Sequence, residues 1–412
     1  MWRPAFFSLA STALFLLGVL AGCTAPATQD TPIVAPRERP VYDYSFNFTL
    51  AADTLVSIPA RQVGEDWHLD NGGEVIVLTN TSDSTWSTPV FDGEIHILPD
   101  GEGQWSGYWE DQMRSALYRI PLEVFKGDST VTSRPVEASS WEVTFNPDGE
   151  PYGGTLVVHA SKKEGGGLRA TVMTPTGDYR FLHGTVEVEK DGREIWTLQT
   201  FDGAHLFWFQ GERLAGRFVG GVFKSGSHYR VNWEADKLSD AIAAGHSTSP
   251  DLGDGVITVH GLNEEGALVR WTQGEGAADV TVLEITGTWC PNCMDAGRAL
   301  LALKRDRPEL EVLSLCFERL GDPAQALGRI NRFKSGIGAT WPHLWAGPAS
   351  KQAAADSLPF LQNVLSFPTT VFVPRVGEVV IHSGFNGPAT GVHYKAQQAR
   401  FGAIIDSLAA TL

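Results

Sequence analysis

Residues Val280–Cys293 read VTVLEITGTWCPNC, and this stretch decides how the C-terminal part of the chain folds. The apolar run Val280–Ile285 is typical of a buried strand. A helix is expected to begin at Cys290, because Pro291 suits the first helical position. The first cysteine would then lie at a helix N-terminus, where free N–H groups and the positive dipole end favour a thiolate. Cys293 follows one turn later and could attack a mixed disulfide formed on Cys290.

Predicted strands and helices alternate around this stretch, over residues 256–412. Their order is βαβ followed by ββα. The expected elements are a hairpin at 256–259 and 268–271, a buried strand at 311–317, a helix after Asp322-Pro323, a helix at 351–365, a hairpin at 369–373 and 379–382, and a last helix with Phe401, Ile404, Ile405, Leu408 and Leu412 on one face.

Three features of this region resemble thioredoxin-fold proteins of the TlpA/ResA type, which are exported thiol-disulfide oxidoreductases related to the AhpC/TSA redoxins. The first is Trp289-Cys290-x-x-Cys293 after a strand. The second is Phe367-Pro368-Thr369 before a strand, which looks like the family's cis-proline loop. The third is the long segment between Phe317 and Pro368. The resemblance implies a thioredoxin fold over residues 256–412 and disulfide reduction without a cofactor, fed by a membrane electron donor.

The resemblance also implies roles for single residues. Cys290 would be the exposed nucleophile and Cys293 the more buried resolving thiol. Pro368 would lie against the disulfide and present backbone groups to a protein disulfide substrate. The substrate groove would be lined by the neighbours of these residues, namely Trp289, Phe367 and Thr369.

Glu284 interrupts the apolar strand six residues before Cys290. Burying a carboxylate is costly, and thioredoxin carries a buried acid at the matching position. Glu284 is therefore the expected general acid/base, with its pKa raised by desolvation. The alternative is a solvent-facing or ion-paired glutamate. ResA-like relatives often carry a glutamate three residues after the second cysteine, where this chain has Ala296.

Two other interpretations of the cysteines were weighed. A structural zinc site would need two more ligands, and no second cysteine pair exists among the four cysteines of the chain. We therefore expect no metal, and we expect Cys316 to fill a buried apolar position. A thiol peroxidase of the AhpC/TSA type remains an alternative function, although Gly287-Thr288-Trp289 lacks the usual peroxidatic context.

Residues 44–245 are expected to form an all-β domain. Short alternating runs such as Glu74–Leu78 and Gly154–His159 recur between turn signals. They predict a barrel or a sandwich, and the succession of strands favours an up-and-down, calycin-like barrel. Its many aromatic residues would pack the core or line a ligand cup. A ligand-binding surface lipoprotein with an auxiliary redox domain is therefore the third functional alternative.

Residues 1–23 are predicted to be a lipoprotein signal peptide. A positive Arg3 and an apolar run over 5–20 precede Leu20-Ala21-Gly22-Cys23. This end resembles a bacterial lipobox, whose cysteine is lipidated and becomes the mature N-terminus. A plain secretory signal and an uncleaved anchor are the alternatives, and all three export the chain. The resemblance places the protein in the cell envelope, anchored through Cys23 and facing the periplasm, on the outer rather than the inner membrane because Thr24 replaces aspartate.

Composition predicts two linkers in the chain, and the distribution of charge excludes one class of partner. Residues 24–43 are a predicted linker because Ala, Pro and Thr are frequent in them. Residues 246–255, which begin HSTSPD, are a second predicted linker. The net charge of −16 is scattered, without a basic stripe. This pattern argues against nucleic acid as a partner.

Overall fold

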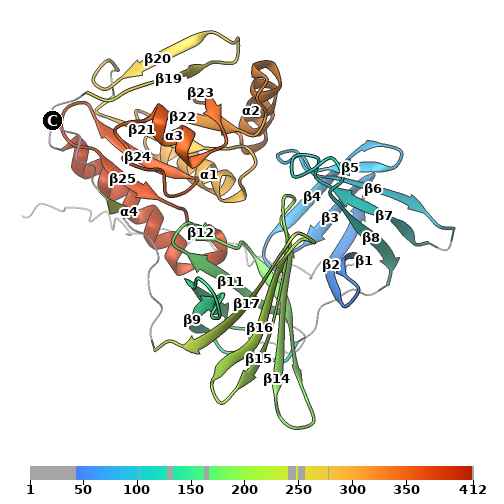
Figure 1. Ribbon diagram of the computed structural model, residues 1–412. Coiled ribbons are helices and arrows are strands. Elements are labelled where there is room, and N and C mark those ends of the chain that lie inside the picture. The colour runs from blue at the N-terminus through green and yellow to red at the C-terminus, as the bar shows by residue number, and fades with distance from the viewer. Residues whose placement is uncertain are drawn as a thin grey trace, which may run out of the picture. The chain divides into compact units, whose positions relative to one another are not determined.

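Two antiparallel β barrels and one mixed sheet make up the described part of the chain (Figure 1). The computed structural model describes residues 43–101, 103–127, 133–161, 167–239, 247–248, 256–276 and 278–410. We call residues 44–126 barrel 1, residues 139–237 barrel 2, and residues 256–410 together with the short strand at 247–248 the CxxC domain. The predicted signal segment 1–23 with Cys23, and residues 24–42 of the first predicted linker, lie outside the described residues.

Barrel 1 is an eight-stranded meander that closes on itself. Closure follows from β1, which pairs with both β2 and β8, so that Phe46 lies opposite Ile58 and Val124. Alternate side chains such as Phe46 and Phe48 point inward and are fully buried. The strands are β1 (Tyr44–Ala51), β2 (Thr54–Val63), β3 (Asp66–Asp70), β4 (Val75–Ser82), β5 (Thr85–Ser87), β6 (Glu94–Pro99), β7 (Trp105–Glu110) and β8 (Arg119–Lys126).

Barrel 2 repeats this architecture. Its strands pair in sequence, β9 also pairs with β17, and β10 pairs with both β9 and β11, which closes the ring. Trp141, Phe145 and Phe209 fill its interior. The strands are β9 (Ser139–Phe145), β10 (Tyr152–His159), β11 (Leu168–Thr174), β12 (Gly177–Asp178), β13 (Leu182–Val188), β14 (Glu194–Phe201), β15 (Leu206–Leu214), β16 (Arg217–Ser225) and β17 (Tyr229–Lys237).

The predicted barrel form of the β region is therefore confirmed, but the sequence did not predict that the region forms two barrels. Where the sequence predicted one β domain over 44–245, the structure has two barrels. The strand spacing and turn signals are alike in both halves, so the pattern along the chain carries no sign of where one ring closes and the next begins.

The CxxC domain is built on a mixed sheet of order β18-β25-β24-β21-β22-β23-β19-β20. Strands β21, β22 and β23 run parallel, and β24 runs antiparallel to β21. The elements are β18 (Ser247–Thr248), β19 (Thr258–Leu262), β20 (Leu268–Thr272), β21 (Val280–Thr286), α1 (Pro291–Asp306), β22 (Glu311–Glu318), α2 (Pro323–Ile337), β23 (His343–Pro348), α3 (Lys351–Ser357), β24 (Thr369–Pro374), β25 (Val380–Ser383), the 3-10 helix η1 (Pro388–Thr390) and α4 (Val392–Ala409).

Most of the expected elements of this domain are confirmed, and three differ. The helix expected over 351–365 ends at Ser357, because Leu358 precedes Pro359 and a residue before proline avoids the helical conformation. Strand β23 was not predicted. Ser247–Thr248, inside the predicted linker 246–255, pairs with β25. Within the described part of the chain, no helix combines the length and apolar character needed to cross a bilayer.

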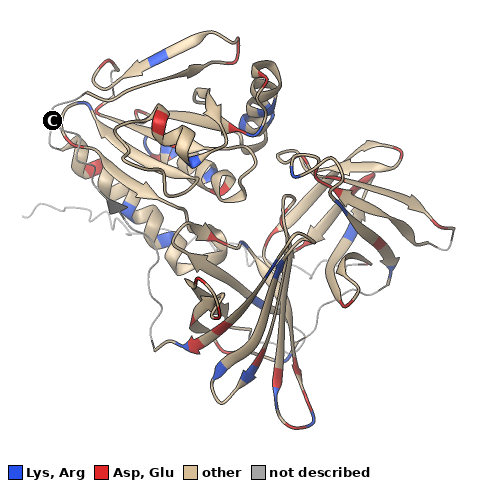
Figure 2. Ribbon diagram, in the orientation of Figure 1, with Lys and Arg blue, Asp and Glu red and all other residues tan. Residues whose placement is uncertain are grey.

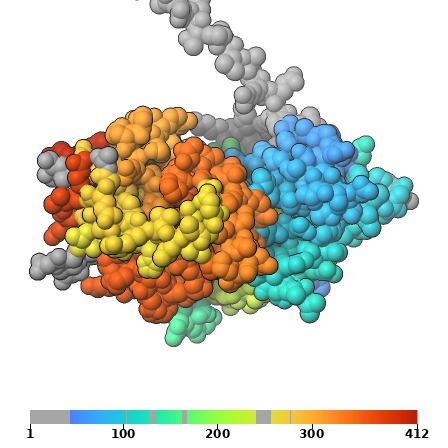
Figure 3. Space-filling view, turned by 90° about the horizontal axis from the view of Figure 1, so that it is seen from above, coloured from blue at the N-terminus to red at the C-terminus, as the bar shows by residue number. Residues whose placement is uncertain are grey.

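The three parts share one apolar cluster. Val90 and Phe91 of barrel 1 and Ala204 of barrel 2 pack in it with Met294 of α1 and Phe385. Figure 3 shows the blue and cyan atoms of barrel 1 directly against orange atoms of the CxxC domain. Figure 2 shows acidic and basic residues interspersed along the ribbon of each part.

Candidate functional site

Cys290 is the N-cap residue of helix α1. Its backbone is extended (φ −110°, ψ 110°), and Pro291 opens the helix. The backbone N–H of Cys293 donates to the Cys290 sulfur at 3.2 Å. The first turn of the helix therefore presents a backbone N–H group to this sulfur.

Cys293 lies behind Cys290 and is fully buried, whereas Cys290 is 7% exposed. The structure shows both as free thiols. Burial raises the pKa of the Cys293 thiol well above its ordinary value, and the neighbouring Cys290 raises it further. The prediction that Cys290 is exposed is therefore wrong, because the loop of Phe367 and the ring of Trp289 cover it. The pair is still asymmetric, since Cys293 is fully buried and holds its proton.

The loop before β24 lies against Cys290. Its Phe367–Pro368 peptide bond is cis, and the Cys290 thiol donates to the Phe367 carbonyl at 3.5 Å. Gly384 N–H donates to the Pro368 carbonyl at 2.9 Å. The Thr369 hydroxyl donates to the Ser366 carbonyl at 2.8 Å. Thr369 is buried, so it holds the loop and does not line an open groove as the sequence suggested.

Trp289 and Phe367 form the half-buried rim beside the dithiol. Their rings meet edge to face, with centroids 5.5 Å apart. The Trp289 indole N–H donates to the Phe317 carbonyl at 2.9 Å, which orients the ring. A group that reaches Cys290 from solvent therefore passes an aromatic rim.

Glu284 lies inside the sheet on β21 and is 1% exposed. Burial raises its pKa to about 7. The Ser314 hydroxyl donates to one carboxyl oxygen at 2.7 Å, and the other oxygen has no hydrogen-bond partner among the described residues. A carboxyl group in this state can take up or release a proton near neutral pH.

Glu318, at the end of β22, is a second buried carboxyl group that sequence reasoning missed. It accepts from the Thr288 N–H at 2.9 Å and from the Thr288 hydroxyl at 2.7 Å, two residues before Cys290. Burial raises its pKa to about 7. The signal was available, because Glu318 closes an otherwise apolar strand just as Glu284 interrupts one.

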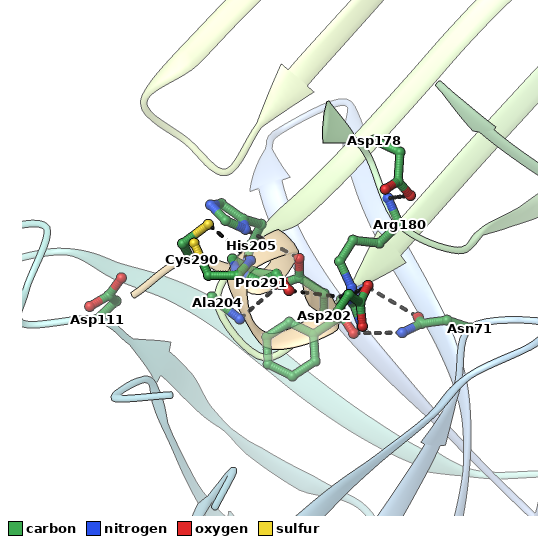
Figure 4. A network of polar contacts seen from close by, with 12 residues as sticks. Asn71, Asp111, Asp178, Arg180, Asp202, Ala204, His205, Cys290 and Pro291 are labelled. Carbon is green, nitrogen blue, oxygen red and sulfur yellow. Dashed lines mark hydrogen bonds and ion pairs between the residues drawn. The ribbon is translucent and has the colours of Figure 1, made fainter. Parts of the chain in front are cut away.

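Arg180 of barrel 2 joins all three parts of the molecule at the start of α1 (Figure 4). It is 2% exposed and forms ion pairs with Asp295 of α1 and Glu74 of barrel 1. Its guanidinium also donates to the Pro291 carbonyl at 3.3 Å. A buried arginine thus braces the dipeptide between the two cysteines.

The Gly-rich loop before α4 is held by the same barrel. Asp178 accepts from Gly387 N–H at 2.6 Å and from Arg180 N–H at 3.1 Å. Burial raises the pKa of Asp178 to about 6, with Asp295 adding to the effect. His159 and the Ala389 carbonyl are 2.7 Å apart. The loop therefore docks the CxxC domain onto barrel 2.

Two turns of barrel 2 approach the cysteines. Gly177, at a φ of +144°, packs so closely on Asn292 that a Cβ there would overlap the amide of Asn292. In the β14–β15 turn, the Asp202 carboxylate is 3.2 Å from the His205 ring nitrogen and accepts from His205 N–H at 2.6 Å. Figure 4 draws this turn with Cys290 and Pro291 in one polar network. No pattern in the sequence predicted the contact of Gly177 with Asn292, because the two residues are far apart along the chain.

Two other groups were considered as sites. Cys316 is fully buried and packs with Leu327 and Ile330, and burial raises its pKa. On barrel 1, Glu94, His96 and Glu110 bring three possible metal ligands together. Glu110 already forms an ion pair with Arg119 at 2.9 Å, so the Arg119 guanidinium neutralises its charge without a metal ion. The expectation of no metal and no cofactor stays a prediction.

Comparison with known proteins finds similarity at the level of structure. No protein-family model matches the sequence, and no curated protein matches it. A DsbF homologue from Corynebacterium diphtheriae superimposes over 41% of this chain and 98% of its own, with 15% identity and a TM-score of 0.30. A thioredoxin family thiol:disulfide interchange protein from Chlorobium tepidum covers 42% and 99%, with 14% identity and a TM-score of 0.27. A secreted thiol-disulfide isomerase from Corynebacterium glutamicum covers 41% and 95%, with 16% identity and a TM-score of 0.28.

Proposed function

We propose that this chain is a thiol-disulfide oxidoreductase of the TlpA/ResA type, with a thioredoxin fold in the CxxC domain. One observation carries the proposal: the Cys290 thiol faces the carbonyl before cis-Pro368 at 3.5 Å, with the protonated, buried Cys293 directly behind it. This arrangement offers one thiol to a substrate and keeps the second for an internal attack.

The reaction is a two-electron exchange. The Cys290 thiolate attacks one sulfur of a protein disulfide, which breaks the S–S bond and releases the first substrate thiolate. Cys293 then loses its proton and attacks the Cys290 sulfur. This second step forms the Cys290–Cys293 disulfide and releases the second substrate thiol. We assign to Glu284 the proton that Cys293 gives up, because its raised pKa suits a proton acceptor near neutral pH.

Trapping tests this mechanism. Cys293→Ala removes the internal attack, so mixed disulfides on Cys290 should accumulate and disappear on addition of dithiothreitol. Cys316→Ala is the matched control, because it removes another fully buried thiol and should trap nothing. The mechanism is wrong if Cys293→Ala yields no more covalent adduct than this control.

We propose that the pair works in the reducing direction, is supplied by a membrane electron donor, and is held at the cell envelope through a lipid on Cys23. The lipobox sequence supports the anchoring. The reduction potential of the Cys290–Cys293 pair tests the direction, and a potential as high as that of known disulfide donors, about −120 mV, would reverse it. Loss of labelled palmitate from a Cys23→Ser variant tests the anchor.

A further inference from the structure

The crevice beside Cys290 is lined by residues of all three parts of the molecule. Its lining includes Trp289 and Arg319 of the CxxC domain, Asp92, Asp111 and Arg114 of barrel 1, and Ala204 of barrel 2. Both carboxylates of this lining are already paired. Asp111 is 3.0 Å from the Arg114 guanidinium, and Asp92 forms ion pairs with Arg329 and Arg332 of α2.

Arg319 differs from Arg114, the other arginine in the lining of the crevice. It follows β22 directly and is exposed. Its guanidinium lies over the Trp289 ring, 4.8 Å from the centroid, next to the reactive cysteine. Among the described residues, no carboxylate forms an ion pair with it. Arg114, in contrast, also donates to the Ala204 carbonyl at 2.9 Å, so its donors are used inside the protein.

The opposite side of the dithiol is closed. Arg180 covers the Pro291 carbonyl, and Gly177 packs on Asn292. The atoms that flank a disulfide sulfur on Cys290 must therefore extend over the rim of Trp289 and Phe367, where Arg319 lies. A guanidinium held by an aromatic ring keeps its N–H donors free for a carboxylate.

We infer that Arg319 selects substrates in which a carboxylate lies next to the disulfide bond, whether the disulfide belongs to a small molecule or to an acidic protein segment. The inference rests on the proposed function, since it describes the same reaction at Cys290. Its consequence is a charge preference in the first step, the attack on the substrate disulfide. The second step, inside the protein, is not affected.

The experiment compares disulfides of different charge. The reduced full chain is mixed with oxidised glutathione (anionic), hydroxyethyl disulfide (neutral) or cystamine (cationic), and the rate constant of oxidation is measured for each. Arg319→Gln should lower the ratio of the glutathione rate to the cystamine rate about three- to tenfold, as expected for one partly exposed charge-assisted contact. Arg319→Lys should keep most of the preference. Arg217→Gln is the control, because it removes an exposed arginine of barrel 2 that is paired with Asp236.

A second pair of probes separates the two sources of the carboxylate. They are disulfide-linked peptides with aspartate or asparagine beside the cysteine. If both glutathione and the aspartate peptide lose rate in Arg319→Gln, the site accepts protein segments; if only glutathione does, the substrate is small. An unchanged charge ratio in Arg319→Gln overturns the inference and leaves the proposed function standing. If the wild type oxidises with none of the disulfides, the proposed function fails as well.

Discussion

Glu284 and Glu318 are buried glutamates of the same sheet, and their carboxyl groups differ in their hydrogen bonds. Burial raises both pKa values to about 7. Both oxygens of Glu318 are used by Thr288, which fixes the chain before the cysteines. One oxygen of Glu284 has no hydrogen-bond partner in the described part of the chain. The second arrangement leaves a proton site available, so we assign proton transfer to Glu284 and a structural role to Glu318.

Burying a charged carboxylate at position 284 destabilises the folded state. The variant Glu284→Gln should therefore change the free energy of unfolding in a pH-dependent way. The folded-state pKa of about 7 lies above the ordinary value of 4.5, so the folded state penalises the charged form. This penalty is absent below pH 4.5, grows as the pH rises to 7 and is complete above pH 7. The variant should therefore match the wild type at pH 4 and exceed it at pH 8 by about 1–3 kcal/mol. Urea unfolding at both pH values measures the difference, and an equal gain at both would contradict this account.

Kinetics test the same residue independently of stability. In Glu284→Gln, the release of substrate from the mixed disulfide should slow about tenfold or more at pH 6–7 and recover at high pH, where hydroxide replaces the lost base. Quenched-flow measurement of the released thiol gives the rate. Glu318→Gln is the control and should keep the wild-type pH profile. Identical profiles in the two variants would remove Glu284 from proton transfer.

At the scale of elements, the first turn of helix α1 is fixed both by its own sequence and by contacts with barrel 2. The cap at Cys290 and the proline at position 291 start it locally. Arg180 then holds it from outside, through the Pro291 carbonyl and Asp295. The positive φ of Arg180, +58°, aims its backbone N–H at Asp178, which in turn accepts from the Gly387 loop. The reactive helix turn is therefore braced by an element of another domain.

Removing the Arg180 side chain should destabilise the folded protein. Arg180→Met leaves the buried carboxyl groups of Glu74 and Asp295 without their cation, which typically destabilises a protein by about 3–5 kcal/mol. It should also increase the rate at which iodoacetamide alkylates Cys290, because the first turn of α1 is released. Arg217→Met, which breaks only exposed ion pairs, should cost about 0–1 kcal/mol and leave alkylation unchanged. Equal effects of the two variants would show that Arg180 is no brace.

At the scale of the whole molecule, both barrels are closed antiparallel rings of consecutive strands, apart from the short extra strand β12 in barrel 2. The next-to-last strand of each follows a glycine of positive φ, Gly103 at +76° before β7 and Gly216 at +85° before β16. Both barrels then send turns to the N-terminus of α1, so the dithiol is enclosed by domains that contain no redox group of their own.

The enclosure predicts a link between barrel packing and thiol access. Phe91→Ala removes a ring from the cluster that barrel 1 shares with Met294 and Phe385. Deleting a buried phenyl ring costs about 3–5 kcal/mol, and here part of that loss loosens the contact beside Cys290. Alkylation of Cys290 should therefore speed up several-fold. Phe46→Ala is the matched control, since Phe46 is fully buried and its ring contacts are with Phe48 and Trp67 of barrel 1 itself. If Phe46→Ala accelerates alkylation as much, the shared cluster does not shield the thiol.

Sequence reasoning succeeded where the cause is local. Cys290-Pro291 starts a helix because a cap and a proline act within one turn. The apolar runs of β21 and β22 mark buried parallel strands because both faces are covered. Glu284 could be singled out because a charge inside such a run has no local explanation.

Tertiary structure alone decided the rest. Two closed rings replaced one predicted β domain because ring closure depends on which distant strands pair, as β9 does with β17. The contacts of Arg180 and the crevice at Arg319 could not be predicted from the sequence either, because each depends on residues that are far apart along the chain. The chain by itself thus determined a dithiol at a helix N-terminus with a carboxyl group in the strand before it. Only the packing of the two barrels on the CxxC domain decided which side of that dithiol is closed, and that Arg319 lies over Trp289 on the other side.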